Sequence, residues 1–158
     1  MNKFQNKLSS FLVLPLIVTN LTLTQPEQPE VKIYNPTPQE AIVRYSSEYG
    51  ISPDLLYSVL FCESGVNPNV KNGDSGHSKG IGQIKDPTFE SLEKQIGEDL
   101  DRISYSDNIK AVAFGISSGQ GNLWTAYRAI KNDGSYTFIN SHTKKEQTVY
   151  CKLQKMPV

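Results

Sequence analysis

The 158-residue chain is short of several residue types, and each shortage excludes a class of protein. Two cysteines are too few for a small domain held together by disulfides alone. Eleven glycines and nine prolines without a repeat exclude a collagen-like chain. No apolar run reaches the ~18 uninterrupted residues of a membrane-spanning helix, which excludes a polytopic membrane protein. With 37% hydrophobic residues, the composition fits one globular domain with a leader or tail.

The chain also lacks an excess of either charge. It has 16 lysines and arginines against 16 aspartates and glutamates, so no overall field attracts nucleic acid or an anionic membrane. The balance is uneven, because Lys3 and Lys7 lie in the first 24 residues, which carry no carboxylate. The rest of the chain is therefore slightly acidic. Neither part predicts a nucleic-acid partner.

Residues 1–24 have the layout of a secretory signal peptide, because a basic start precedes a short apolar run, Phe11–Val18, which Pro15 interrupts. No pair of small residues marks a cleavage site, so the segment is predicted to be a signal peptide or a retained N-terminal anchor; a buried helix is the alternative. Residues 25–36 are proline-rich and predict an extended linker. We therefore expect export to the periplasm, cell surface or medium, with the folded domain in residues 37–158.

Apolar residues at three- and four-residue spacing, with prolines at helix starts and glycines at helix ends, predict a mainly α domain. The expected helices cover 38–49 and 53–63, open at Asp86-Pro87 with Asp86 as the cap, open at Ser106 or Asp107, and cover 123–131. Residues 65–79 are rich in Gly, Asn and Ser and predict a loop of a length that is usually functional. After Gly134 the pattern predicts a small β-hairpin or an irregular tail, with a helix over 144–155 as the alternative.

Glu63 lies at the C-terminal end of the second predicted helix, beside Leu60 and Phe61. The negative end of the helix dipole and the apolar neighbours both disfavour the ionised carboxylate, so we expect a raised pKa. A carboxylic acid that stays protonated near neutral pH can donate a proton to a departing glycosidic oxygen. The alternative is a solvated glutamate at a helix end, and the motifs that follow Glu63 favour the first interpretation.

Four motifs follow one another over about residues 38–131. They are Glu63-Ser64-Gly65, Gly80-Ile81-Gly82-Gln83-Ile84, Asn108-Ile109 and Ala126-Tyr127. In this order they resemble the SLT-type lytic transglycosylases, the goose-type-lysozyme-like peptidoglycan glycosidases. The resemblance implies a lysozyme-like fold with Glu63 as the single catalytic acid and base. It further implies that Ser64 and Gln83 line the sugar-binding cleft, that Tyr127 reaches the catalytic carboxylate, and that Asn108 belongs to the substrate-binding set.

Two positions depart from the family pattern. Gly82 stands where the family often has methionine, and Arg128 stands where the last motif usually has asparagine. Arg128 is expected to change contacts near the cleft. Gly80 and Gly82 are expected to form a turn or to let the backbone approach a sugar closely, and the two roles are compatible. Trp124 is a candidate sugar-stacking ring, as is Tyr105, although core packing is the commoner role for such rings.

A single acid requires a nucleophile from the substrate, because most glycosidases use two carboxylates. The nearest second candidates are Asp86, better explained as a helix cap, and Asp74 in the glycine-rich loop. In the resembled family the acetamido group of muramic acid assists departure, and its 6-hydroxyl then attacks to give a 1,6-anhydro sugar. Attack by water would make the same site a lysozyme. We therefore predict an enzyme without a cofactor that cleaves the MurNAc–GlcNAc β-1,4 bond of peptidoglycan.

The two cysteines and two histidines suggest alternatives. A cysteine peptidase would need Cys62 with His77 or His142, but a thiolate is favoured at a helix N-terminus or beside cations, whereas Cys62 precedes Glu63 at a helix C-terminus. In an oxidising compartment Cys62 either pairs with Cys151 or both remain separate buried thiols. The histidines lie far apart in the sequence, so no metal site is predicted. A non-catalytic wall-binding module with the same fold is the remaining alternative.

Overall fold

The computed structural model describes residues 35–73, 76–141 and 143–157. The predicted leader, nearly all of the predicted linker, Asp74 and His142 lie outside these residues. The described residues belong to one compact unit. None of the helices in it is long and apolar enough to span a bilayer.

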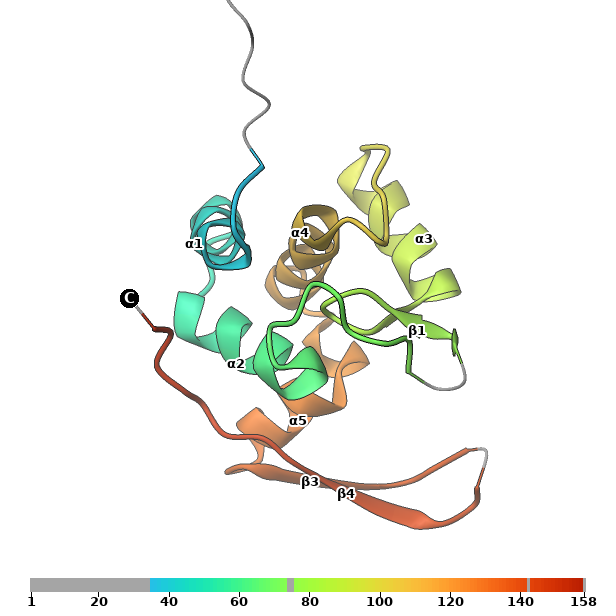
Figure 1. The fold of residues 1–158 in the computed structure, drawn as a ribbon. Coiled ribbons are helices and arrows are strands. Elements are labelled where there is room, and N and C mark those ends of the chain that lie inside the picture. The colour runs from blue at the N-terminus through green and yellow to red at the C-terminus, as the bar shows by residue number, and fades with distance from the viewer. Residues whose placement is uncertain (1–34, 74–75, 142, 158) are drawn as a thin grey trace, which may run out of the picture. The chain divides into compact units, whose positions relative to one another are not determined.

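Five α-helices form the main secondary structure of the described residues (Figure 1). They are α1 (Pro38–Glu48), α2 (Pro53–Ser64), α3 (Asp86–Ile96), α4 (Tyr105–Ser117) and α5 (Thr125–Lys131), with a short 3-10 helix, η2 (Gly121–Leu123), before α5. Proline lies in the first turn of α1, α2 and α3, where its missing N–H costs nothing. The mainly α fold class predicted from the sequence is confirmed.

Three helix starts differ from the predictions. The residue before α3 is Lys85, and Asp86 begins the helix and forms an ion pair with Arg102, so Asp86 is not the predicted cap. Helix α4 starts earlier than predicted, because the Ser104 side chain accepts the Asp107 N–H. Helix α5 starts two residues later than predicted, because residues 121–123 form the tighter η2 turn. Several residues near each start suit a cap, and only the backbone path selects one.

Helix α4 forms the centre of the core and packs against α1, α2 and α3 (Figure 1). Its buried residues include Ile109, Val112 and Ile116. Helix α2 contributes Leu56 and Leu60, which are fully buried. Each such side chain stabilises the fold by roughly 1.5–3 kcal/mol. The position of α2, which carries Glu63, is therefore fixed by the core.

Two antiparallel hairpins complete the described fold. The first pairs β1 (Ser78–Lys79) with β2 (Ile84–Lys85) and closes the glycine-rich loop. The second pairs β3 (Ser135–Ile139) with β4 (Glu146–Tyr150), with Ser135 opposite Tyr150 and Ile139 opposite Glu146. The hairpin alternative for the tail is therefore the right one, and the helical alternative over 144–155 is wrong.

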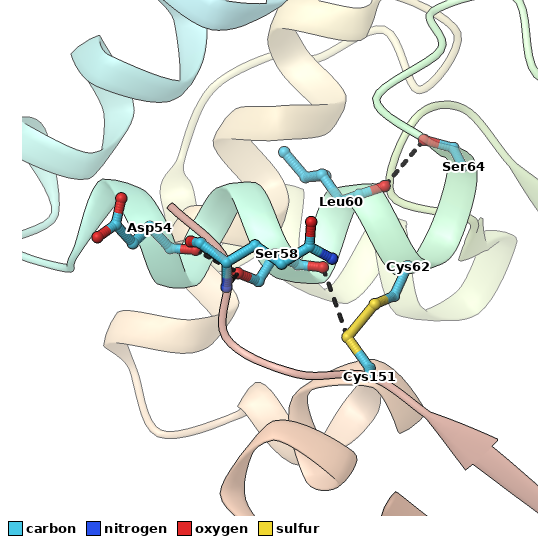
Figure 2. The surroundings of a disulfide bond; sticks show 7 residues. Asp54, Ser58, Leu60, Cys62, Ser64 and Cys151 are labelled. Carbon is cyan, nitrogen blue, oxygen red and sulfur yellow. Dashed lines mark hydrogen bonds between the residues drawn. A yellow bond between two sulfur atoms is a disulfide. The ribbon is translucent and has the colours of Figure 1, made fainter. Parts of the chain in front are cut away.

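The chain after β4 runs back along α2 and is fixed to it (Figure 2). A disulfide joins Cys62 to Cys151 with their Cα atoms 6.1 Å apart, which settles the choice that the sequence left open. The Ser58 hydroxyl accepts the Gln154 N–H at 2.8 Å. Asp54 accepts the Lys155 ammonium at 2.8 Å and the Met156 N–H at 3.0 Å. The hydrogen bond from Lys155 lowers the pKa of the Asp54 carboxyl most, and the one from the Met156 N–H lowers it further.

Candidate active site

A cleft of about 420 Å³ lies where the end of α2, the β1–β2 hairpin, the starts of α3 and α5, and the β3–β4 hairpin meet. Helices and hairpins that are far apart in the sequence therefore form its walls. The residues that line it are Glu63, Gly73, Ser78, Gln83, Ile84, Lys85, Thr88, Leu123, Trp124, Thr125, Phe138, Ile139, Asn140, Ser141 and Gln147.

Glu63 is the penultimate residue of α2, half-buried, and lines the cleft. Gly65 ends the helix in the left-handed conformation at φ 69°, which glycine adopts without a steric penalty. Its N–H donates to the Phe61 carbonyl at 2.7 Å and closes the last turn. On the other side of Glu63, the disulfide at Cys62 fixes the preceding residue. The backbone that carries the carboxylate is thus held from both sides.

Glu63 is the single acidic residue among the described residues that line the cleft. Asp86, the second candidate by sequence, is paired with Arg102 at the start of α3 and does not line the cleft. Burial lowers the pKa of the Arg102 guanidinium. Asp74 lies outside the described residues. The described part of the cleft therefore presents one carboxyl group to a substrate.

Gln83 lines the same cleft as Glu63, as its motif predicts, but its amide is already bound to the backbone. Its Oε1 accepts the Gly73 N–H at 3.0 Å, and its Nε2 donates to the Gly80 carbonyl at 2.9 Å. The residue itself has a left-handed φ of 48°. Gln83 therefore ties the glycine-rich loop to the β1–β2 turn and shapes the cleft wall.

Asn108 lies beneath the cleft, fully buried in α4. Its Oδ1 accepts the Gly82 N–H at 2.7 Å, and its Nδ2 donates to the carbonyls of Arg102 at 2.9 Å and Lys79 at 3.3 Å. Both ends of the amide bind backbone groups, and Asn108 is not among the residues that line the cleft. The geometry favours a role in positioning the β1–β2 turn over direct contact with a sugar.

The two motif glycines are required by this packing. A Cβ on Gly80 would collide with the Asn108 amide, and one on Gly82 would collide with the Val112 side chain. The Gly82 carbonyl also accepts the Trp124 indole N–H at 3.0 Å. With this backbone, the methionine common in the resembled family has no room at position 82.

The other predicted residues lie behind the cleft or away from it. The Ser64 hydroxyl donates to the Leu60 carbonyl at 3.1 Å, and the Tyr127 ring packs against Gly121; neither residue is in the lining. Trp124 lines the cleft but is only 4% exposed, so its ring is mainly a packing element. The Tyr105 hydroxyl contacts the Pro36 carbonyl and fixes the start of the domain. The structure thus brings Glu63, Gln83 and Trp124 together at the cleft.

Comparison with known proteins adds one match. The sequence pattern described as the Transglycosylase SLT domain matches residues 40–147. The chain belongs to this family. The match begins inside α1 and ends in β4, so every described residue that lines the cleft lies within the SLT domain. No curated protein and no solved structure matches the chain. Membership supports the suspected resemblance and places the chain in a family of lytic transglycosylases that act on peptidoglycan.

One wall of the SLT domain cleft was missed by sequence reasoning. Phe138, Ile139, Asn140 and Ser141 from β3 and its turn face the cleft, together with Gln147 of β4. The Asn140 Nδ2 donates to the Gln147 Oε1 at 2.9 Å across the hairpin. Alternating apolar residues predicted a strand here, but no motif signals that the hairpin turns toward Glu63. That orientation follows from its attachment to α5.

The disulfide bears on the cysteine-peptidase alternative. A disulfide sulfur carries no thiolate, so the SLT domain in this state has no nucleophile at Cys62. Among the residues that the structure describes, no three His, Cys, Asp or Glu side chains cluster as a metal site.

Proposed function

We propose that this protein is a lytic transglycosylase that cleaves the MurNAc–GlcNAc β-1,4 bond of peptidoglycan and leaves 1,6-anhydro-muramyl ends. The observation that carries the proposal is the placement of Glu63, the single acid among the described cleft-lining residues, within the SLT family match. The sugar rings of a peptidoglycan strand carry hydroxyl and acetamido groups. The amides and hydroxyls of the lining, including Asn140, Ser141 and Gln147, suit such a substrate.

In the proposed reaction Glu63 acts twice. Its carboxylic acid first gives a proton to the glycosidic oxygen as the C1–O bond breaks, while the acetamido oxygen of the muramic acid forms a bond to C1. The Glu63 carboxylate then takes the proton of the 6-hydroxyl, whose oxygen bonds to C1 and displaces the acetamido oxygen. The carboxyl group is protonated again at the end, and no external nucleophile is consumed.

The other predicted residues take supporting roles in this proposal. Gln83 shapes the wall near the scissile bond through its two backbone hydrogen bonds. Asn108 positions the same turn from below. Ser64 and Tyr127 are proposed to shape the ends of α2 and α5 around the carboxylate, so that their effect on the sugar is indirect.

Two alternatives share the same geometry. Attack by water at C1 would make the protein a hydrolytic lysozyme, and loss of turnover with retained binding would make it a wall-binding module. We also propose that the protein is exported by its N-terminal leader, because its substrate lies outside the cytoplasm.

The decisive experiment measures turnover of purified peptidoglycan by the full chain and by Glu63→Gln. We expect the substitution to reduce the rate of soluble muropeptide release by at least about a thousandfold, because it removes the acid and the base together. Glu90→Gln is the matched control, since Glu90 is an exposed residue of α3 outside the cleft. Equal rates for the wild type and Glu63→Gln would refute the proposal, as would the absence of cleavage by the wild type.

Mass spectrometry of the products separates the transglycosylase from the lysozyme. Intramolecular attack gives ends that are lighter by one water than those from hydrolysis and cannot be reduced by borohydride. We expect anhydro ends only. Reducible ends would assign the lysozyme reaction to the same site.

A further inference from the structure

A second pocket, of about 410 Å³, lies at the base of the β3–β4 hairpin. It is lined by Asn122, Arg128, Lys131, Asn132 and Tyr136. Arg128 is the residue that departs from the asparagine of the family motif. Arg128 does not line the Glu63 cleft, so the reaction at Glu63 does not explain why an arginine stands at this position.

The Arg128 guanidinium is held in a fixed orientation. Its Nε–H donates to the Asn122 carbonyl at 2.6 Å, and its Nη1 donates to the Tyr136 hydroxyl at 3.2 Å. The guanidinium carbon also lies 5.1 Å from the centre of the Tyr136 ring. A guanidinium has five N–H donors, so these bonds leave donors for a ligand. Because the planar group is already oriented, little entropy is lost when a planar anion binds.

The pocket is cationic. Arg128 and Lys131 are three residues apart on α5, so their side chains extend on the same side of the helix. In the described part of the chain neither forms an ion pair, and no acidic residue lines the pocket. Two neighbouring cations repel each other until an anion lies between them. A carboxylate fits best, because its two oxygens match the guanidinium donors.

The pocket continues the cleft along β3. Tyr136 in the pocket and Phe138 in the cleft are stacked, with ring centres 6.1 Å apart. Asn122 in the pocket directly precedes Leu123 in the cleft. A ligand bound at Glu63 can therefore extend over the stacked rings to Arg128 without leaving the protein surface.

We propose that this pocket binds a carboxylate of the peptide substituents of the glycan, so that the protein prefers peptide-bearing over peptide-free strands. The inference rests on the proposed function, because it takes the strand in the cleft to be peptidoglycan. The lactyl-linked peptides of muramic acid carry free carboxylates, which complement the charge of the pocket, and the Tyr136–Phe138 contact joins this pocket to the cleft.

The test measures binding by titration calorimetry with the full chain carrying Glu63→Gln, so that no ligand is cleaved. Three tetrasaccharides of alternating GlcNAc and MurNAc are compared: one without peptides, whose lactyl carboxyl groups are converted to primary amides, one with peptides, and one with the peptide carboxyl groups converted to primary amides. We expect the peptide-bearing ligand to bind about fivefold tighter than the other two, which is the size expected of a partly exposed, charge-assisted contact.

Variants assign this preference to the pocket. In the same background, Arg128→Gln with Lys131→Gln should reduce the affinity ratio to about one, and Lys94→Gln, which removes a charge on α3 outside both pockets, should keep it. If the double variant does not fold, Lys131→Glu, at an exposed position, should lower the ratio alone. The inference is overturned if the ratio persists in these variants, if the amidated ligand binds as tightly as the acid, or if peptides make no difference. Binding of none of the three ligands would refute the proposed function itself.

Discussion

At the scale of single residues, the cleft depends on a side chain that does not reach it. Asn108 is fully buried and binds three backbone groups, from β1, from the β1–β2 turn and from the loop before α4. A buried amide that satisfies backbone donors and acceptors in this way costs little, whereas its removal leaves those groups without partners. The turn that carries Gln83 is held in place by this residue.

Substitution of Asn108 with alanine should therefore lower the free energy of unfolding by about 3 kcal/mol, since the Gly82 N–H and two carbonyls lose their partner. Urea titration followed by circular dichroism measures the change. The control is Asn69→Ala, at an exposed position in the loop, which should change the same quantity by less than about 0.5 kcal/mol. A similar, small effect of both substitutions would contradict the positioning role.

At the scale of elements, α2 is fixed at three levels. Its apolar side chains are buried in the core, its first and middle turns are hydrogen-bonded to the tail through Asp54 and Ser58, and its last turn is joined to Cys151 by the disulfide. The catalytic candidate, Glu63, follows Cys62 directly. The tail therefore acts as a support for the helix that carries the acid.

Replacement of both cysteines by serine, Cys62→Ser with Cys151→Ser, should lower the free energy of unfolding by about 4 kcal/mol. The disulfide joins residues 89 apart, and loss of a bridge of this span returns that amount of loop-closure entropy to the unfolded chain. Thermal and urea unfolding of the full chain measure the loss. Asp54→Asn, which weakens the tail contacts but keeps the disulfide, should cost clearly less. An unchanged free energy of unfolding in the double-serine variant would show that the bridge does not stabilise the fold.

At the scale of the whole molecule, the cleft exists only where α2, the two hairpins and the start of α5 meet. The β3–β4 hairpin supplies Phe138 and Ile139 to the cleft that Glu63 of α2 also lines, although it follows α2 by some 70 residues in the sequence. The hairpin also joins the cleft to the cationic pocket. Substrate preference is therefore expected to depend on the hairpin more than on the motif residues.

Phe138→Ala should raise KM for peptidoglycan by about fivefold and change kcat less, because Phe138 lines the cleft wall and carries no group that can transfer a proton. Tyr150→Ala is the control on the same hairpin: this side chain is 79% exposed and lies outside the cleft. Steady-state turnover of solubilised glycan strands, with circular dichroism to verify folding, gives both constants. Equal KM values for Phe138→Ala and the wild type would exclude the hairpin from the binding surface.

Much of this arrangement could be predicted because the signals are local. Proline and glycine positions predicted the helices to within two residues, the Gly65 stop set the end of α2, and the motif order predicted the family. The cap of α3 and the starts of α4 and α5 were one or two residues away from the prediction, since neighbouring residues cap a helix about equally well. The disulfide was left open, because pairing depends on the distance between two distant segments.

Residue spacing along the chain was enough to predict the helical fold, the family and the position of the candidate acid at a helix end. It could not predict that Asn108 is buried against the β1–β2 turn, that Gly82 excludes a larger residue, or that Arg128 lines a separate pocket. These features depend on which other elements of the fold pack against each residue, and those elements are distant in the sequence. A motif places a residue on an element, and packing decides what that residue contacts.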